Sequence, residues 1–124
     1  MDTRTQPLRI LIADDDPQVL ILFERLLTRG GYSVIAVSSG DAAMKVLEER
    51  SVDLLVLDLS MPDPDGFELL RVLRATKPGL RILAVSGALH GALLKPARIL
   101  GATASLSKTD APKLLLQTVQ NLLQ

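Results

Sequence analysis

Five polar residues each stand at the end of an apolar run: Asp14, Asp15, Asp58, Ser86 and Lys108. Three carboxylates that meet within a few ångströms repel one another, and a hard divalent cation such as Mg²⁺ relieves that repulsion. A carboxylate can also act as a nucleophile and form an aspartyl phosphate. Lys108 would then neutralise phosphoryl oxygens, and the Ser86 hydroxyl would hydrogen-bond to one. The set indicates phosphoryl transfer to an aspartate, provided that the fold brings these side chains together.

Apolar runs alternate with segments of helical spacing along the whole chain. The runs begin near Ile10, Val34, Leu54, Ile82 and Ala104. Residues 10–13, 54–57 and 82–85 are apolar without alternation, as strands covered on both faces of a parallel sheet require. The pattern predicts an α/β fold, a doubly wound five-stranded parallel sheet with about five helices, for which we expect the strand order 2-1-3-4-5 that is common in such sheets. In that order the first and third strands are neighbours at the switch point, where ligands bind beyond the carboxyl ends of the strands.

The predicted helix boundaries carry residues that suit them. The N-caps are Asp16 before Pro17, then Ser38 or Ser39, then Asp110, and Gly30 with Gly31 ends the first helix. The segment 87–100 differs because it contains Pro96, and proline inside a helix costs about 3 kcal/mol. We expect a loop or a broken first turn before Pro96 and a short helix after it.

Composition excludes several classes of function. The chain has 124 residues, of which 48% are hydrophobic, so we expect one domain over residues 1–124 with its core at about 8–123. The 14 basic and 14 acidic residues balance, which argues against nucleic-acid binding. Cysteine is absent and His90 is the single histidine, which excludes thiol chemistry and a multi-histidine metal centre. No run approaches the roughly 20 apolar residues of a membrane span. We therefore expect a cytoplasmic protein that does not contact membranes and is a monomer or weak dimer.

The chain resembles a response-regulator receiver domain of two-component signalling, of the CheY-like single-domain type, over residues 8–123. The resemblance is carried by ILIADDDP at 10–17, DLLVLDLSMP at 53–62, Asp65-Gly66, ILAVSG at 82–87, Gly101-Ala102 and LSK at 106–108. Each motif alone is weak evidence for the family. The combination is specific for it: the acidic pair after the first strand, Asp58 followed by Met61-Pro62 and Asp65-Gly66, and Lys108. The fold of that family is flavodoxin-like.

The resemblance implies a role for each site residue. Asp58 is the phosphoacceptor, and Asp15 and the backbone carbonyl of Ser60 join it as Mg²⁺ ligands. Asp14 acts mainly through metal-bound water. Ser86 senses the phosphoryl group, and Lys108 pairs with the acyl phosphate. The donor is a histidine kinase or a histidine phosphotransfer protein, and the output is a contact with a downstream protein that the sequence does not name. Such a domain is not an enzyme beyond its own phosphorylation.

Two positions, Thr109 and Ser105, depart from the family pattern. Thr109 follows Lys108 where the family has a proline after a cis peptide bond, and we expect a trans bond because a non-proline cis bond costs about 2.5–4 kcal/mol. Ser105 stands where the family commonly has a tyrosine or phenylalanine that moves on activation. Small side chains at Ser60 and Ala88 should leave the site accessible to donors and water.

Two other functions compete with this interpretation. A pseudo-receiver that is never phosphorylated is favoured by Ser105 and Thr109, but the intact acidic set argues against it. A phosphatase of the haloacid-dehalogenase type would use Asp14 as nucleophile and Asp16 as general acid. Against that, Asp16 precedes Pro17 and starts a helix, and the chain is short and lacks that family's cap insertion.

Overall fold

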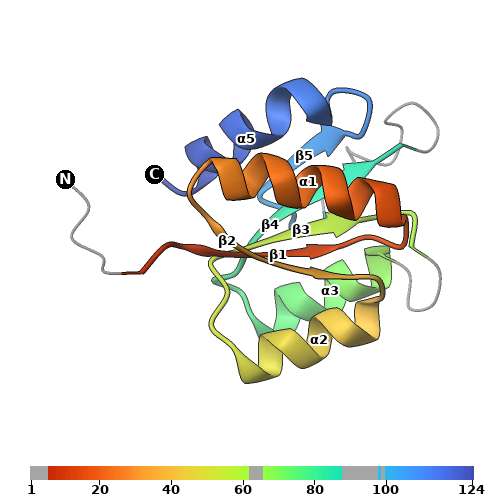
Figure 1. Ribbon diagram of the computed structural model, residues 1–124. Helices are drawn as coiled ribbons and strands as arrows, with labels where there is room; N and C mark the ends of the chain where they lie inside the picture. The colour runs from red at the N-terminus through yellow and green to blue at the C-terminus, as the bar shows by residue number, and fades with distance from the viewer. Residues whose placement is uncertain (1–5, 62–65, 88–97, 99) are drawn as a thin grey trace.

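A five-stranded parallel sheet forms the centre of the molecule (Figure 1). The computed structural model describes residues 6–61, 66–87, 98 and 100–124. The strands are β1 (Arg9–Ala13), β2 (Ser33–Val37), β3 (Leu54–Asp58), β4 (Arg81–Ser86) and β5 (Ala104–Ser107). They pair in the order β2-β1-β3-β4-β5, and every pair is parallel. The predicted fold class and strand order are therefore confirmed.

Helices cover both faces of this sheet. They are α1 (Pro17–Arg29), α2 (Gly40–Glu49), α3 (Gly66–Thr76) and α5 (Ala111–Leu122). Figure 1 shows α1 and α5 on one face and α2 and α3 on the other. Successive strand residues point to opposite faces, so Ile10 and Ile12 pack in the cluster under α1 and α5, whereas Leu11 packs in the cluster over α2 and α3. Burial on both faces is the reason that the strands are apolar without alternation.

Backbone geometry decides which of the predicted caps form. Asp16 and Ser39 are extended, with ψ of 113° and 159°, and their side chains accept the N–H of Gln18 and Ala42. The second helix is thus capped by Ser39 and not by Ser38. Gly30 ends α1, and Gly31 follows at a φ of 93°, which favours glycine.

Asp110 is the N-cap residue of α5, as predicted, but it does not cap the helix through its side chain, which makes no capping hydrogen bond. Its backbone is already helical, with ψ at −13°, and capping by the side chain requires an extended residue. The backbone carbonyl of Asp110 accepts the N–H of Lys113 and Leu114 instead.

The short helix expected after Pro96 lies almost entirely outside the described residues, as do His90 and Ala88. Arg98 is helical. Among the helices that the structure describes, none has both the length and the apolar character needed to cross a membrane.

The two serines before α2 provide a test of the cap. Ser39→Ala should lower the free energy of unfolding by about 1 kcal/mol, because the N–H of Ala42 loses its acceptor. Ser38→Ala is the matched control and should stay within about 0.5 kcal/mol of the native chain. Urea denaturation followed by circular dichroism measures both, and equal losses from the two variants would contradict this account.

Candidate functional site

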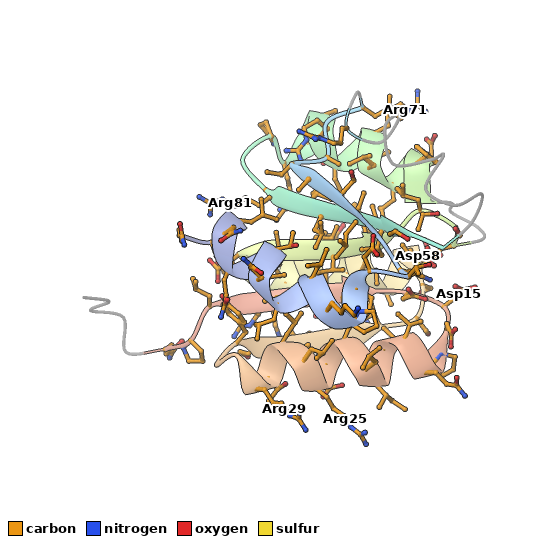
Figure 2. All side chains as sticks on the ribbon, turned by 90° about the horizontal axis from the view of Figure 1, so that it is seen from above. Asp15, Arg25, Arg29, Asp58, Arg71 and Arg81 are labelled. Carbon is orange, nitrogen blue, oxygen red and sulfur yellow. The ribbon has the colours of Figure 1, made fainter. Side chains whose placement is uncertain are left out.

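Three carboxylates meet at the carboxyl ends of β1 and β3. These strands are neighbours, and Ala13 is paired with Leu57, so the residues that follow them lie side by side. Oxygen atoms of Asp14, Asp15 and Asp58 all lie within 4.8 Å of one another. Figure 2 shows Asp15 and Asp58 close together at one end of the sheet, with Arg81, at the start of β4, at the other end. The convergence predicted from the strand order is confirmed.

The members of this cluster differ in burial. Asp14 and Asp58 are each 1% exposed, whereas Asp15 is open to solvent. Two buried carboxylates next to each other are unfavourable unless a positive charge or hydrogen-bond donors accompany them. The structure supplies both.

Lys108 supplies the positive charge. Its Nζ lies 2.8 Å from Asp14 Oδ2 and 3.2 Å from Asp58 Oδ2. Lys108 follows β5, and its backbone N–H donates to the carbonyl of Ser86 at 3.1 Å, which extends the β4–β5 pairing to the site. The sequence indicates only a phosphoryl group as the partner of this lysine, so it does not predict the direct ion pair with Asp14.

Backbone N–H groups supply the donors. The N–H of Asp16 donates to Asp14 Oδ1, and the N–H of Ser60 donates to Asp58 Oδ1, both at 2.9 Å. Each buried carboxylate therefore has one oxygen held by the backbone two residues onward and the other facing Lys108. This arrangement fixes the orientation of both carboxylates before any ligand arrives.

Two hydroxyl groups complete the site. Ser86 ends β4 and is fully buried. Its Oγ lies 3.4 Å from Oγ of Ser60, which is exposed. The contact joins residues 26 positions apart, and only the adjacency of β3 and β4 could have suggested it.

Burial and neighbouring charges shift the pKa values of Asp58 and Lys108. Burial raises the pKa of Asp58, and the charge of Asp14 raises it further, against the lowering effects of the Ser60 N–H and of Lys108. Burial alone would lower the pKa of Lys108, but the hydrogen bonds and charges of Asp14 and Asp58 outweigh it and raise that pKa above its ordinary value. Lys108 thus stays an ammonium group, and it pairs with two of the three carboxylates, Asp14 and Asp58.

The donor atoms fit a hard divalent cation. Apart from the Lys108 ammonium, the buried Oδ2 atoms of Asp14 and Asp58 have no hydrogen-bond partner among the described residues. The cluster offers oxygen ligands only, which Mg²⁺ prefers, and it retains excess negative charge. The residues present are therefore suited to hold such an ion.

The departures noted in the sequence lie on β5 and directly after the residue that follows it. The N–H of Thr109, a group that proline lacks, donates to Oγ of Ser107 at 3.2 Å. Ser105 is half-buried on β5 opposite Ala84. The trans isomer expected at the Lys108–Thr109 bond stays a prediction.

Comparisons with known proteins point to one family. Residues 10–120 match the response regulator receiver domain. The transcriptional regulatory protein GlrR of Escherichia coli is 35% identical over 88 residues, which cover 71% of this chain and 19% of that protein. The alkaline phosphatase synthesis regulator PhoP of Bacillus subtilis is 38% identical over 78 residues, covering 63% of this chain and 32% of PhoP. The chain therefore spans less than a third of the length of these curated relatives.

Solved structures agree with this match. A response regulator structure from Chloroflexus aurantiacus superimposes with a TM-score of 0.87 at 29% identity, covering 95% of this chain and 98% of that one. A CheY-like receiver domain from Methanospirillum hungatei gives a TM-score of 0.84 at 28% identity, covering 95% and 94%.

The raised pKa of Asp58 has a consequence for stability. A carboxyl group whose folded pKa is raised favours folding while it is neutral, below its unfolded pKa of about 3.9, and that contribution is lost as the pH rises through the folded value. Ionised Asp58 therefore destabilises the fold at neutral pH. Asp58→Asn should raise the melting temperature by roughly a few degrees at pH 7 in metal-free buffer, and the gain should shrink as the pH falls toward about 4 and be lost below it.

Calorimetry over a range of pH measures this effect. Glu48→Gln, which removes an exposed carboxylate from α2, is the control and should change little at either pH. A melting temperature for Asp58→Asn below that of the native chain at pH 7 would contradict the argument.

Proposed function

Since the chain belongs to the response regulator receiver domain family, we propose that Asp58 accepts a phosphoryl group from a histidine kinase or histidine phosphotransfer protein. Receiver domains act in two-component signalling through phosphorylation of an aspartate. The observation that carries the proposal is the placement of Asp58. Its carboxylate is buried, 3.2 Å from the Lys108 ammonium and within reach of two further acids.

The transfer uses groups that are already in position. An oxygen of the Asp58 carboxylate attacks the phosphorus of phosphohistidine, the new O–P bond forms, the P–N bond breaks, and the imidazole leaves with the electron pair and takes up a proton. The Ser60 N–H holds the Asp58 carboxylate in one orientation. The Lys108 ammonium faces the charge that the phosphoryl oxygens bring. Such catalysis is mainly positioning and charge stabilisation.

We propose Asp15, Asp58 and the backbone carbonyl of Ser60 as ligands of Mg²⁺, with Asp14 acting through a metal-bound water. The contacts of Asp14 support its indirect role, because one oxygen accepts the Asp16 N–H and the other faces Lys108. Asp15 is exposed and forms part of the acid cluster. The ion would neutralise oxygens of the transferred group.

Ser86 is our proposed sensor of the phosphoryl group. Its hydroxyl is buried at the end of β4 and lies beside Ser60, so a phosphoryl group on Asp58 would arrive next to it. A shift of Ser86 toward that group would alter the populations of conformers around β4 and β5, and a downstream protein would read the change. Ser105 stands on β5 where the family commonly has a tyrosine or phenylalanine. This response therefore does not use the movement of an aromatic ring at that position.

The contacts of Asp16 argue against the dehalogenase-type alternative. That mechanism needs Asp16 as a general acid, but Asp16 Oδ1 accepts the N–H of Gln18 at 2.9 Å as the cap of α1. The contacts described above are the same for a receiver and for a pseudo-receiver, so only an experiment distinguishes the two functions.

Intact mass after incubation with acetyl phosphate and Mg²⁺ tests the phosphoacceptor. The native chain should gain one phosphoryl group, because Asp58 is positioned for attack, and the gain should vanish in Asp58→Ala and in EDTA. Asp14→Ala is the discriminating variant. An adduct that survives Asp58→Ala but is lost in Asp14→Ala would show that Asp14, and not Asp58, is the nucleophile, and would contradict the proposal. A native chain that takes up no group from acetyl phosphate or from a phosphorylated histidine donor would be a pseudo-receiver.

Thermal denaturation with and without Mg²⁺ tests the metal site. An ion at 100 times its Kd that binds only the folded chain stabilises it by about 2.7 kcal/mol. Asp15→Asn should weaken Mg²⁺ binding on the order of tenfold or more, since a ligand is lost. Asp16→Asn is the matched control, because it removes a neighbouring charge and asparagine caps a helix as well as aspartate. Equal loss of affinity in both variants would indicate a general charge effect and not coordination.

A further inference from the structure

Gly66, the first residue of α3, lies against the backbone of the segment that carries Asp58. A Cβ atom added to Gly66 would stand 2.4 Å from the carbonyl oxygen of Asp58 and 2.5 Å from Cα of Leu59. Both distances are shorter than real Cβ contacts allow, and both neighbours are backbone atoms that cannot rotate away. The start of α3 thus lies too close to the end of β3 to leave room for a Cβ atom between them.

Neither backbone conformation nor helix propensity explains a glycine here. The left-handed φ angles among the described glycines belong to Gly31 and Gly101, and Gly66 is not one of them. Alanine is also a better helix former than glycine. The remaining reason for glycine at this position is the lack of space for a Cβ atom. The role of Gly66 is therefore to let α3 approach the backbone of Asp58 and Leu59.

We infer that Gly66 is a positioning residue for the phosphoacceptor, because its missing Cβ lets α3 fix the backbone of Asp58 and Ser60 against β4. From the other side, the N–H of Leu59 donates to the carbonyl of Val85 at 2.9 Å. The Asp58–Leu59 backbone is therefore held between β4 and the first residue of α3.

The rest of α3 gives little room for the helix to withdraw. Leu69, Leu70 and Leu73 are at most 3% exposed in the core below the sheet. A Cβ at position 66 would consequently displace the end of β3. Since the Ser60 N–H holds Asp58 Oδ1, the displacement would pass to the carboxylate and to the Ser60 carbonyl.

The opposite half of the site would stay where it is. Asp14 and Asp15 follow β1, and Lys108 follows β5, so none of them belongs to the displaced segment, which Lys108 contacts through its ion pair with Asp58. Gly66→Ala would therefore change the spacing between the two halves of the site. Misplacement of reacting groups by about 1 Å can lower a rate on the order of a hundredfold. This inference rests on the proposed phosphorylation of Asp58.

The test compares Gly66→Ala with Gly79→Ala in the intact chain. Gly79 is exposed in the turn between α3 and β4, and a Cβ there would meet nothing within 4 Å. Leu70→Val is a second control, because it loosens the packing of α3 in the core without placing an atom near Asp58. Three quantities are measured for each variant: the rate of phosphorylation at saturating acetyl phosphate, the Kd for Mg²⁺ alone, and the NMR shift of the Ser60 amide in metal-free protein.

Gly66→Ala should slow phosphorylation on the order of tenfold to a hundredfold, weaken Mg²⁺ binding and move the Ser60 amide resonance. Gly79→Ala should change none of these quantities. Leu70→Val should lower stability while the rate per folded molecule stays near that of the native chain. If the native chain is phosphorylated but Gly66→Ala leaves the phosphorylation rate, the Kd for Mg²⁺ and the Ser60 amide shift unchanged, the inference is overturned.

Two further outcomes are also decisive. If Gly66→Ala is partly unfolded, the measurements are repeated with trimethylamine N-oxide, which favours the folded state. A variant that stays unfolded there would make Gly66 a requirement of the fold and overturn a role in the site. If the native chain takes up no phosphoryl group, the proposed function fails, and the Mg²⁺ and amide measurements still decide whether Gly66 positions Asp58.

Discussion

The Lys108 ammonium between two buried carboxylates is the interaction on which the site depends. Asp14 and Asp58 are each 1% exposed, and one cation lies within 3.2 Å of both. Without that charge the two carboxylates would face each other in a nearly water-free place, which folded proteins avoid. Lys108 does not balance the third acid, so the site keeps the negative charge that attracts a divalent cation. The lysine thus makes the cluster compatible with folding and leaves it able to bind.

That arrangement exists because of the order of the strands. Parallel strands end at the same edge of the sheet, and the reversal of strand order places β1 and β3 side by side with β5 two strands from β3. Residues from three separate parts of the sequence therefore meet without long loops. Helices on both faces bury most of β1, β3 and β4, the edge strands β2 and β5 are largely half-buried, and two apolar clusters keep the strand ends in place. The core thereby supports the geometry of the site as well as the stability of the chain.

Sequence reasoning succeeds where a feature depends on local pattern and fails where it depends on distances between backbones. Apolar runs were enough to predict the sheet, and the strand order known for doubly wound sheets was enough to bring Asp14, Asp15 and Asp58 together. Residue type alone could not show that Ser39 caps its helix through its side chain whereas Asp110 does not, because the ψ angles of the two residues differ. No local pattern could show that a Cβ at Gly66 would meet the carbonyl of Asp58.

The same geometry joins binding at the site to the conformation of the chain. Burial and a neighbouring charge make ionised Asp58 unfavourable, so any group that neutralises it stabilises the arrangement in which it binds. Asp58 is attached through Leu59 to β4 and through backbone contact to the start of α3. A change in charge at Asp58 therefore passes to those two elements through the backbone, and to Asp14 and Lys108 through their charges. The part of the fold that responds to the site is set by the backbones and the charges that contact Asp58.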